Sequence, residues 1–250
     1  MKVVLEVNNL SKNFGNTQVL NNINLKVYEG EFIVIMGPSG SGKSTLLYNI
    51  SGMDRASSGD VLFKDRKIYT LDDEDLSEIR LKHMGFVFQN SYLLRNLSIR
   101  DNIILAGFKA KLVPREEVNK KADDLMRKTG ISDIAASDIK KVSGGQLQRA
   151  AICRALINQP DILFGDEPTG ALNSSSTREV MDIINTINAE GTTVIIVTHD
   201  AKVASRASRV LYILDGNIHD ELSLGDYRND EMDRSSREKK LSSWLESQGF

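Results

Sequence analysis

Short apolar runs recur along the chain and predict buried β-strands. Several lack the polar alternation of a half-exposed strand, which indicates burial on both faces of a sheet. Helical patterns lie between some of them, as in Gly42–Ile50 and Ser175–Asn188. Strands that alternate with helices predict an α/β fold with a mostly parallel sheet. The predicted strands are Val3–Val7, Phe32–Met36, Gly85–Phe88, Ile162–Phe164, Thr193–Val197 and Val210–Ile213.

Two stretches depart from this alternation. Up to about Leu71, short strand-like pieces are separated by Asn, Gly and Asp turns, which predicts an antiparallel β element near the N-terminus. Residues 93–159 instead resemble successive helices, which predicts a helical sub-domain inserted into the α/β core. Its expected helices are Ile99–Ala110, Arg115–Thr129 and Gly144–Asn158.

Length and charge limit the class of protein. With 250 residues, the chain is long enough for one large domain, or for one domain with a sub-domain. Its formal net charge is −2, so it has no strong electrostatic attraction for nucleic acid or anionic lipid. This weighs against a dedicated nucleic-acid-binding protein without excluding one, and we expect no nucleic-acid partner.

The compartment is predicted from cysteine usage and from the N-terminus. Cys153 is the only cysteine, so no internal disulfide can form, which fits a reducing compartment. Glu6 stands where a signal peptide would need its apolar stretch, and no apolar run reaches the roughly 18–20 residues of a membrane span. We therefore expect a cytoplasmic protein, with any membrane role supplied by a partner.

A glycine-rich segment directly after the strand Phe32–Met36 carries the strongest chemical signal. It matches G-x-x-x-x-G-K-[ST] between a strand and a helix, where the glycines let backbone N–H groups approach phosphate. Lys43 would lie near the β- and γ-phosphates, and the Ser44 hydroxyl would bind Mg²⁺. Kinases, GTPases and ATPases share this motif, so alone it indicates only a nucleoside triphosphate. The nucleotide-binding residues predicted here are Gly37, Pro38, Ser39, Gly40, Ser41, Gly42, Lys43, Ser44 and Thr45.

Two acids follow the apolar strand Ile162–Phe164. Asp166 is placed to hold Mg²⁺ through water, and Glu167 to orient or deprotonate an attacking water. Taken alone, two acids after a strand more often cap a helix N-terminus. The phosphate loop upstream favours the metal and base roles.

A third motif, Ser143-Gly144-Gly145-Gln146, opens a predicted helix. Ser143 is a good N-cap, and the two glycines leave backbone N–H groups open to an anion. A simple helix cap would account for Ser143, but not for two successive glycines followed by Gln146. The motif therefore predicts a second phosphate cradle, which would serve a nucleotide bound mainly elsewhere, such as one on another subunit.

Together these motifs, in the chain order of phosphate loop, Ser143–Gln146 and then Asp166-Glu167, resemble the nucleotide-binding subunit of an ATP-binding cassette (ABC) transporter. The resemblance covers residues 1 to about 221, the expected ATPase domain with the helical sub-domain inserted at about 93–159, and implies ATP with Mg²⁺. The charged extension, 222–250, lies outside it. There Leu241, Trp244 and Leu245 have helical spacing and predict a short amphipathic helix, either packed on its own domain or docked on a partner.

The resemblance adds three residues that their surroundings alone would not identify. Phe14 matches an aromatic that stacks on adenine, although it could be an ordinary core or surface phenylalanine. Gln89 matches a glutamine that reaches Mg²⁺ and the attacking water, and His199 a histidine that contacts the γ-phosphate. The implied catalytic set is Glu167, His199, Gln89 and Lys43, and the implied metal ligands are Ser44, Gln89 and Asp166.

Asn173 departs from the family pattern. The family usually has an aspartate at the end of this loop, and Asn173 keeps a hydrogen-bonding side chain without the charge. Because that loop is expected to cross to the opposite nucleotide site, the rate and coupling of hydrolysis depend on the substitution. All the binding residues are present, so an active ATPase is expected.

Within the family, the segments Phe86–Leu94 and Glu167–Asn173 resemble lipoprotein-release, macrolide-export and bacitracin-type resistance ATPases. The tail segment Arg237–Glu246 resembles the antimicrobial-peptide-resistance members. This implies a dimer of two copies, or of this chain with a homologue, that sandwiches two ATP molecules. It also implies an integral-membrane permease that holds the subunit at the cytoplasmic face of the membrane.

Two other classes remain open. A soluble non-transport ABC ATPase, such as a cluster-assembly factor, would carry the same nucleotide site. Repair and chromosome types are disfavoured because no sustained heptads separate the motifs, and translation types because the chain has one cassette. A catalytically inactive regulatory cassette would lack catalytic residues, and only Asn173 points that way.

Overall fold

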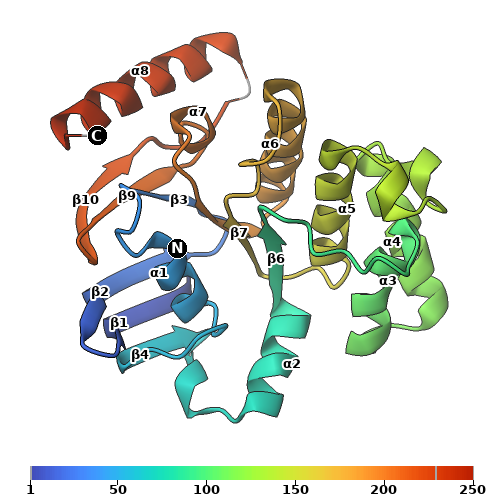
Figure 1. Ribbon diagram of the computed structural model, residues 1–250, viewed down its shortest axis with the longest axis horizontal. Coiled ribbons are helices and arrows are strands. Elements are labelled where there is room, and N and C mark those ends of the chain that lie inside the picture. The colour runs from blue at the N-terminus through green and yellow to red at the C-terminus, as the bar shows by residue number, and fades with distance from the viewer. Residues whose placement is uncertain (1, 229, 250) are drawn as a thin grey trace. The chain divides into compact units, whose positions relative to one another are not determined.

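The computed structural model describes residues 2–228 and 230–249, which form two compact units (Figure 1). Unit 1 comprises Met1–Asp72 and Thr193–Phe250, and unit 2 comprises Asp73–Thr192. The chain thus leaves the first unit once and returns to it. Unit 2 contains the whole predicted helical insertion, 93–159, together with the strands and helices on either side of it.

An antiparallel sheet forms the N-terminal part of unit 1. Its strand order is β2-β1-β4-β5, and every neighbouring pair is antiparallel. In β1, Leu5 and Val7 are buried, and the alternation resumes at Leu10 and Lys12 after a register shift against β2 between Val7 and Leu10. The expected antiparallel element is confirmed. Its strands are β1 (Val3–Phe14), β2 (Thr17–Tyr28), β4 (Ser58–Phe63) and β5 (Arg66–Lys67).

The remaining strands of unit 1 are ordered β10-β9-β3-β8. β3 is parallel to β8 and to β9, whereas β10 pairs with β9 as an antiparallel edge. Every residue of β3 and β8 is buried, as their uninterrupted apolar sequences predicted. The elements are β3 (Phe32–Met36), β8 (Thr193–Val197), β9 (Arg209–Leu214), β10 (Asn217–Ser223), α1 (Lys43–Ile50), a 3₁₀ turn at Ile68–Thr70, α7 (Ala201–Ala204) and α8 (Glu231–Ser247).

Unit 2 holds two parallel strands and most of the helices. β6 pairs with β7 along its full length, which completes the expected mixture of an antiparallel sheet with parallel strands and helices. The elements are α2 (Asp73–His83), β6 (Met84–Phe88), α3 (Ile99–Ala110), α4 (Arg115–Lys128), α5 (Gly144–Leu156), β7 (Ile162–Asp166), α6 (Ser174–Ala189), and 3₁₀ turns at Ser132–Ile134 and Ile139–Lys141.

The helices α3, α4 and α5 enclose a small core of their own. Ile103, Val118, Met126 and Cys153 are all buried in it. Asn102, also buried, accepts a hydrogen bond from the Leu94 backbone N–H at 2.6 Å and ties the preceding loop to α3. Apolar packing together with this polar tie explains why the insertion is a stable helical part of unit 2.

The thiol of Cys153 should be unreactive in the folded protein. It is buried beside the Thr129 hydroxyl, 3.1 Å away, and burial raises its pKa from 9.0 to about 11. The Cys153 thiol ionises at lower pH in the unfolded chain than in the folded protein. Its contribution to folding stability is therefore complete below the pKa of the unfolded chain and is lost as the pH rises through the pKa of the folded protein. We expect no alkylation by iodoacetamide at about pH 8 until the chain unfolds. Rapid alkylation of the native protein would contradict this.

Among the described residues, no helix has both the length and the apolar character needed to cross a membrane. The longest described apolar strands are short and belong to the sheets above.

Candidate phosphate-binding and hydrolysis site

The loop after β3 has a backbone that only glycine can adopt without strain. Gly37 has φ 147° and Gly42 has φ 100°, both in the region that side-chain-bearing residues avoid. A Cβ on Gly37 would lie 2.0 Å from the carbonyl oxygen of Ile213 in β9. The loop is thus wrapped tightly against the neighbouring strand.

This loop ends at a helix N-terminus that no side chain caps. α1 begins at Lys43, its N-cap is Gly42, and its first turn contains no acidic residue. The Lys43 ammonium donates to the Pro38 carbonyl at 2.6 Å, so it lies over the loop. The partial positive charge of the helix end and the ammonium both favour a bound anion. The residues present therefore fit a phosphate chain.

His199 lies at the same edge of unit 1 as the phosphate loop. Ile35 in β3 pairs in parallel with Val197 in β8, and Gly37 and His199 each come two residues after that pair. The backbone N–H of Thr198 donates to the Ile35 carbonyl at 3.2 Å, which links the two strand ends. His199 itself is exposed. The structure thus brings the predicted histidine to the strand end that carries the loop.

Phe14 is not a core residue. It is the last residue of β1 and its side chain is 54% exposed. The Lys12 ammonium lies 4.9 Å from the ring centroid and is held 2.7 Å from the Asp54 carboxylate. Of the interpretations left open by the sequence, a buried structural phenylalanine is excluded.

In unit 2, three predicted residues meet at the ends of paired strands. Phe88 pairs with Asp166, so Gln89 and Glu167 each follow that pair directly. A Cβ on Gly170 would lie 3.0 Å from the Gln89 amide nitrogen, so the loop after Glu167 packs against the glutamine side chain. Register and packing therefore place Gln89, Asp166 and Glu167 at one edge of unit 2.

Glu167 has an unusual backbone conformation. Its φ is 49°, which is rare for a residue with a side chain and costs conformational energy. The backbone N–H of Gly170 donates to the Glu167 carbonyl at 3.0 Å and closes the turn. Such strain concentrates at functional sites because it fixes the direction of a side chain.

The Ser143–Gln146 segment forms a reciprocal helix cap. The Gln146 N–H donates to the Ser143 hydroxyl at 3.3 Å, and the Ser143 N–H donates to the Gln146 side-chain oxygen at 2.9 Å. The expectation that capping accounts for Ser143 alone was wrong, because Gln146 completes the capping box. Anion binding by this segment remains a prediction.

Close packing supplies a second reason for Gly145. A Cβ there would approach the Ser176 hydroxyl oxygen to 2.8 Å, because the first turns of α5 and α6 touch. The Asn173 side chain caps α6 by accepting from the Ser176 N–H at 2.9 Å. That cap requires an oxygen and not a charge, so asparagine fulfils it as aspartate would.

Two polar residues of α5 hold the backbone segment around Gln89. Neither of them was identified from the sequence as part of the site. Gln148 is buried and donates to the Phe88 carbonyl at 2.9 Å. Arg154 donates to the Ser91 carbonyl at 2.8 Å and the Tyr92 carbonyl at 2.7 Å, and burial lowers its pKa. Their partners are about 60 residues away in the chain, so no local pattern could have indicated them.

The predicted residues are divided between the two units. Phe14, the loop 37–45 and His199 belong to unit 1, whereas Gln89, Ser143–Gln146, Asp166 and Glu167 belong to unit 2. In unit 1 the phosphate loop and His199, and in unit 2 the residues Gln89, Asp166 and Glu167, lie at the carboxyl ends of parallel strands. That edge is where open α/β sheets bind their ligands.

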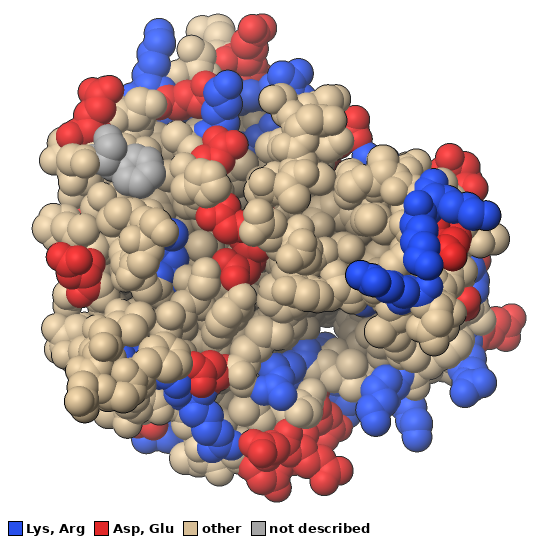
Figure 2. All heavy atoms as spheres, viewed as in Figure 1, with Lys and Arg blue, Asp and Glu red and all other residues tan. Residues whose placement is uncertain are grey.

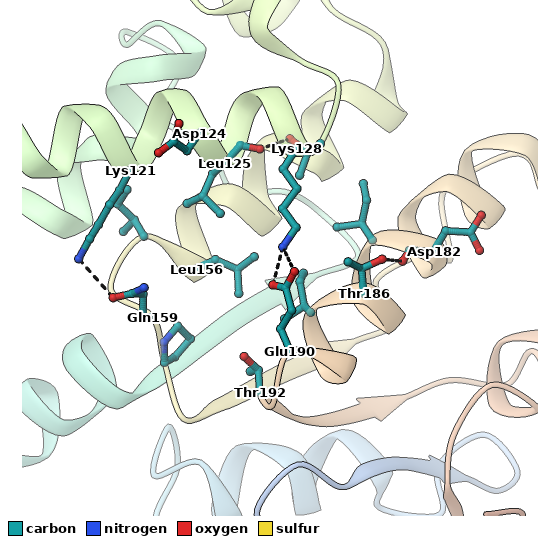
Figure 3. A pocket seen from close by; sticks show the side chains of 15 residues that line it. Lys121, Asp124, Leu125, Lys128, Leu156, Gln159, Asp182, Thr186, Glu190 and Thr192 are labelled. Atoms are coloured by element: carbon teal, nitrogen blue, oxygen red, sulfur yellow. Dashed lines mark hydrogen bonds and ion pairs between the residues drawn. The ribbon is translucent and has the colours of Figure 1, made fainter. Parts of the chain in front are cut away.

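A separate cavity of about 590 Å³ lies within unit 2, between α4, α6 and the end of α5 (Figure 3). Its lining mixes apolar side chains such as Leu156 with polar ones. Lys128 forms an ion pair with Glu190, and Lys121 donates to the Gln159 side-chain oxygen at 3.2 Å. None of the predicted nucleotide-site residues lines it, so it is distinct from the site described above.

Charged side chains of both signs are interspersed on the face drawn in Figure 2. Acidic side chains gather at the lower edge, over α2, whose first turn carries Asp73, Glu74 and Asp75. No large basic surface is visible on this face. This agrees with the formal net charge of −2.

A parallel strand that enters a glycine loop and an uncapped helix defines the class of phosphate-loop nucleotide-binding proteins. The family described as ABC transporter matches residues 20–170, and the chain belongs to this family. Its fold is the ABC ATPase fold, since two solved dimeric ATP-binding cassettes superpose with a TM-score of 0.82. One of them, in a post-hydrolysis state with ADP and Pi, is 37% identical and covers 89% of this chain and 100% of its own.

Curated relatives share the same family. The lipoprotein-releasing system ATP-binding protein LolD of Leptospira interrogans is 40% identical over 86% of this chain and 90% of its own length. The bacitracin export ATP-binding protein BceA of Halalkalibacterium halodurans is 39% identical over 89% of this chain and 90% of its own. The macrolide export protein MacB of Pasteurella multocida is 39% identical, and the match covers 34% of its length. The chain is an ABC transporter ATPase subunit of the type represented by LolD, BceA and MacB.

Proposed function

We propose that this subunit binds ATP with Mg²⁺ and couples its hydrolysis to a membrane permease at the cytoplasmic face of the cell membrane. The observation that carries the proposal is the phosphate loop, which runs from a fully buried strand into a helix N-terminus that no side chain caps. The curated relatives support the transport role, since two are named as ATP-binding proteins of lipoprotein release and bacitracin export and one as an ATP-binding/permease protein of macrolide export.

The residue roles follow from charge and position. Lys43 stabilises negative charge on the phosphates, and Glu167 accepts a proton from the attacking water. His199 contacts the γ-phosphate, and Phe14 stacks on adenine. A divalent cation supplies charge neutralisation and would be held by Ser44, Gln89 and, through water, Asp166, whose hydroxyl, amide and carboxylate oxygens are the donors Mg²⁺ prefers.

The working unit is a head-to-tail dimer, formed by two copies or by this chain with a homologue. Each ATP lies between the phosphate loop of one chain and Ser143–Gln146 of the other. The exposed Ser143 and Gly144 at the start of α5 support this arrangement, as do the solved dimeric cassettes. Hydrolysis then lets the dimer reopen, and the helical sub-domain passes this motion to the permease.

The transported or sensed substrates are antimicrobial peptides or related amphiphiles. Support comes from the name of the bacitracin export relative and from the tail segment Arg237–Glu246, which resembles the peptide-resistance members. Substrate recognition itself would belong to the permease.

The test is to purify the chain from its native membranes in mild detergent and identify the proteins that accompany it by mass spectrometry. We expect a multi-span membrane protein with a large external domain. A soluble companion without a membrane protein would replace this proposal with a non-transport ABC ATPase, such as a cluster-assembly factor, that uses the same nucleotide site.

A further inference from the structure

The C-terminal helix α8 buries a charged residue in its apolar face. Arg237, Leu241 and Leu245 are spaced four residues apart, so they lie on one face of the helix, and all three are buried. Arg237 is 4% exposed, and burial lowers its pKa. A charged group is rarely this buried unless its donors are satisfied.

Arg237 donates five hydrogen bonds to backbone carbonyls, as many as a guanidinium has N–H groups. One set holds the segment after α7: Nε reaches Ser205 at 2.8 Å and Nη2 reaches Ala207 at 2.5 Å. The other set holds residues 224–226, after β10, at 3.0 to 3.3 Å. The side chain thus joins two chain segments to α8.

The first of these segments is continuous with the loop that carries His199. The Asp200 N–H donates to the Thr198 hydroxyl at 3.1 Å, and the Asp200 carboxylate caps α7 at Lys202. The Ser205 N–H donates to the Ala201 carbonyl at 2.9 Å. Residues 198–205 are therefore one hydrogen-bonded turn. Since α7 has only four residues, it is too short to hold this shape unaided.

β3 anchors the far end of the same segment. The Ser208 N–H donates to the Phe32 carbonyl at 2.8 Å, and the Leu224 N–H donates to the Ser208 carbonyl at 2.8 Å. Figure 1 shows α8 alongside α7. From α8, Arg237 holds the backbone of this segment at the Ser205 and Ala207 carbonyls. Other polar contacts of α8 reach β10 instead, through Lys240 and Trp244.

We propose that Arg237 is a positioning residue for His199, fixing the end of α7 so that the loop at the end of β8 keeps its shape. This inference rests on the role proposed above for His199. The planar fork of arginine can serve both segments at once, whereas a lysine ammonium reaches fewer carbonyls from a single point. The C-terminal helix is thereby part of the support of the hydrolysis site.

The test measures kcat and KM for ATP in the full-length chain, for Arg237→Met, His199→Ala and the double variant. We expect Arg237→Met to lower kcat about 10- to 100-fold with little change in KM, since it displaces a group that acts on the reacting phosphate. In the His199→Ala background it should lower kcat no further. Lys240→Met, on the same helix, should match the wild type.

Three results would overturn the inference: an unchanged kcat for Arg237→Met, an equal loss of kcat in both backgrounds, or a loss shared by Lys240→Met. If Arg237→Met does not fold, Arg237→Lys replaces it, since it keeps the charge and part of the contacts. A kcat for Arg237→Lys between those of the wild type and His199→Ala, with no further loss when the two substitutions are combined, supports the inference. A wild-type kcat for Arg237→Lys rejects it. A wild-type kcat for His199→Ala alone rejects the role proposed for His199, which separates the two failures.

Discussion

Replacing Glu167 with glutamine should lower the rate of ATP hydrolysis about 100- to 10,000-fold, the usual contribution of a general base. The amide has nearly the same shape as the carboxylate but cannot accept a proton from water. The turn that holds this residue is made by backbone groups, including the Gly170 N–H, so it should persist. Phosphate release measures the rate, and binding of a fluorescent ATP analogue should remain intact.

Glu190→Gln is the matched control. Glu190 lies in the same unit, but it pairs with Lys128 in the lining of the separate cavity (Figure 3). An exposed ion pair of this kind contributes only about 0–1 kcal/mol, so turnover should be close to that of the wild type. Normal turnover in Glu167→Gln, or an equal loss in both variants, would reject the assignment of Glu167 as the base.

Gly37→Ala should abolish nucleotide binding and destabilise the fold by about 3 kcal/mol or more. The new methyl group would lie 2.0 Å from the Ile213 carbonyl oxygen. The backbone of β9 would have to move to relieve this clash. Thermal unfolding measures the stability, and titration with an ATP analogue measures the binding.

Gly40→Ala separates the effect of close packing from the effect of backbone conformation. Gly40 also has a positive φ, 81°, but nothing lies within 4 Å of an added Cβ. The expected cost is about 1 kcal/mol, from the backbone strain alone. If the two variants unfolded at the same temperature, the contact between the loop and β9 would not be what requires glycine at position 37.

Elements whose side chains are buried on both faces were predictable from the sequence. β3 and β8 are continuous apolar runs that match their predicted bounds, and α3 matches as well. β1 was predicted only as far as Val7, but it continues to Phe14. Its second half is polar and irregular in register, so the alternation that identifies a strand is lost there.

The elements that were missed have few buried residues. α2 buries only Leu76 and Ile79 among eleven mostly charged and polar residues, and β10 is a half-exposed edge strand. α8 was expected around Leu241–Leu245, but it begins at Glu231. The helix is longer because Arg237 extends its buried face, and a sequence pattern treats arginine as a solvent-exposed residue.

The candidate site shows the same limit. The phosphate loop and the acids after β7 were evident because each is a local motif after an apolar strand. The capping role of Gln146 and the supports from Gln148, Arg154 and Arg237 were not. The capping role of Gln146 lies in the local spacing Ser143-x-x-Gln146, which the sequence interpretation overlooked. Gln148, Arg154 and Arg237 instead donate to carbonyls that only the fold brings near, which no spacing along the chain encodes.

Trp244 makes the C-terminal helix observable by light. It is the only tryptophan in the chain, its indole N–H donates to Asp220 at 2.8 Å, and its ring lies edge-on to Tyr212, 6.1 Å between centroids. Tyr212 pairs with Met36, the residue before the phosphate loop. The intrinsic emission of the unlabelled protein is therefore an optical reporter on β9, the strand beside the one that leads into the phosphate loop.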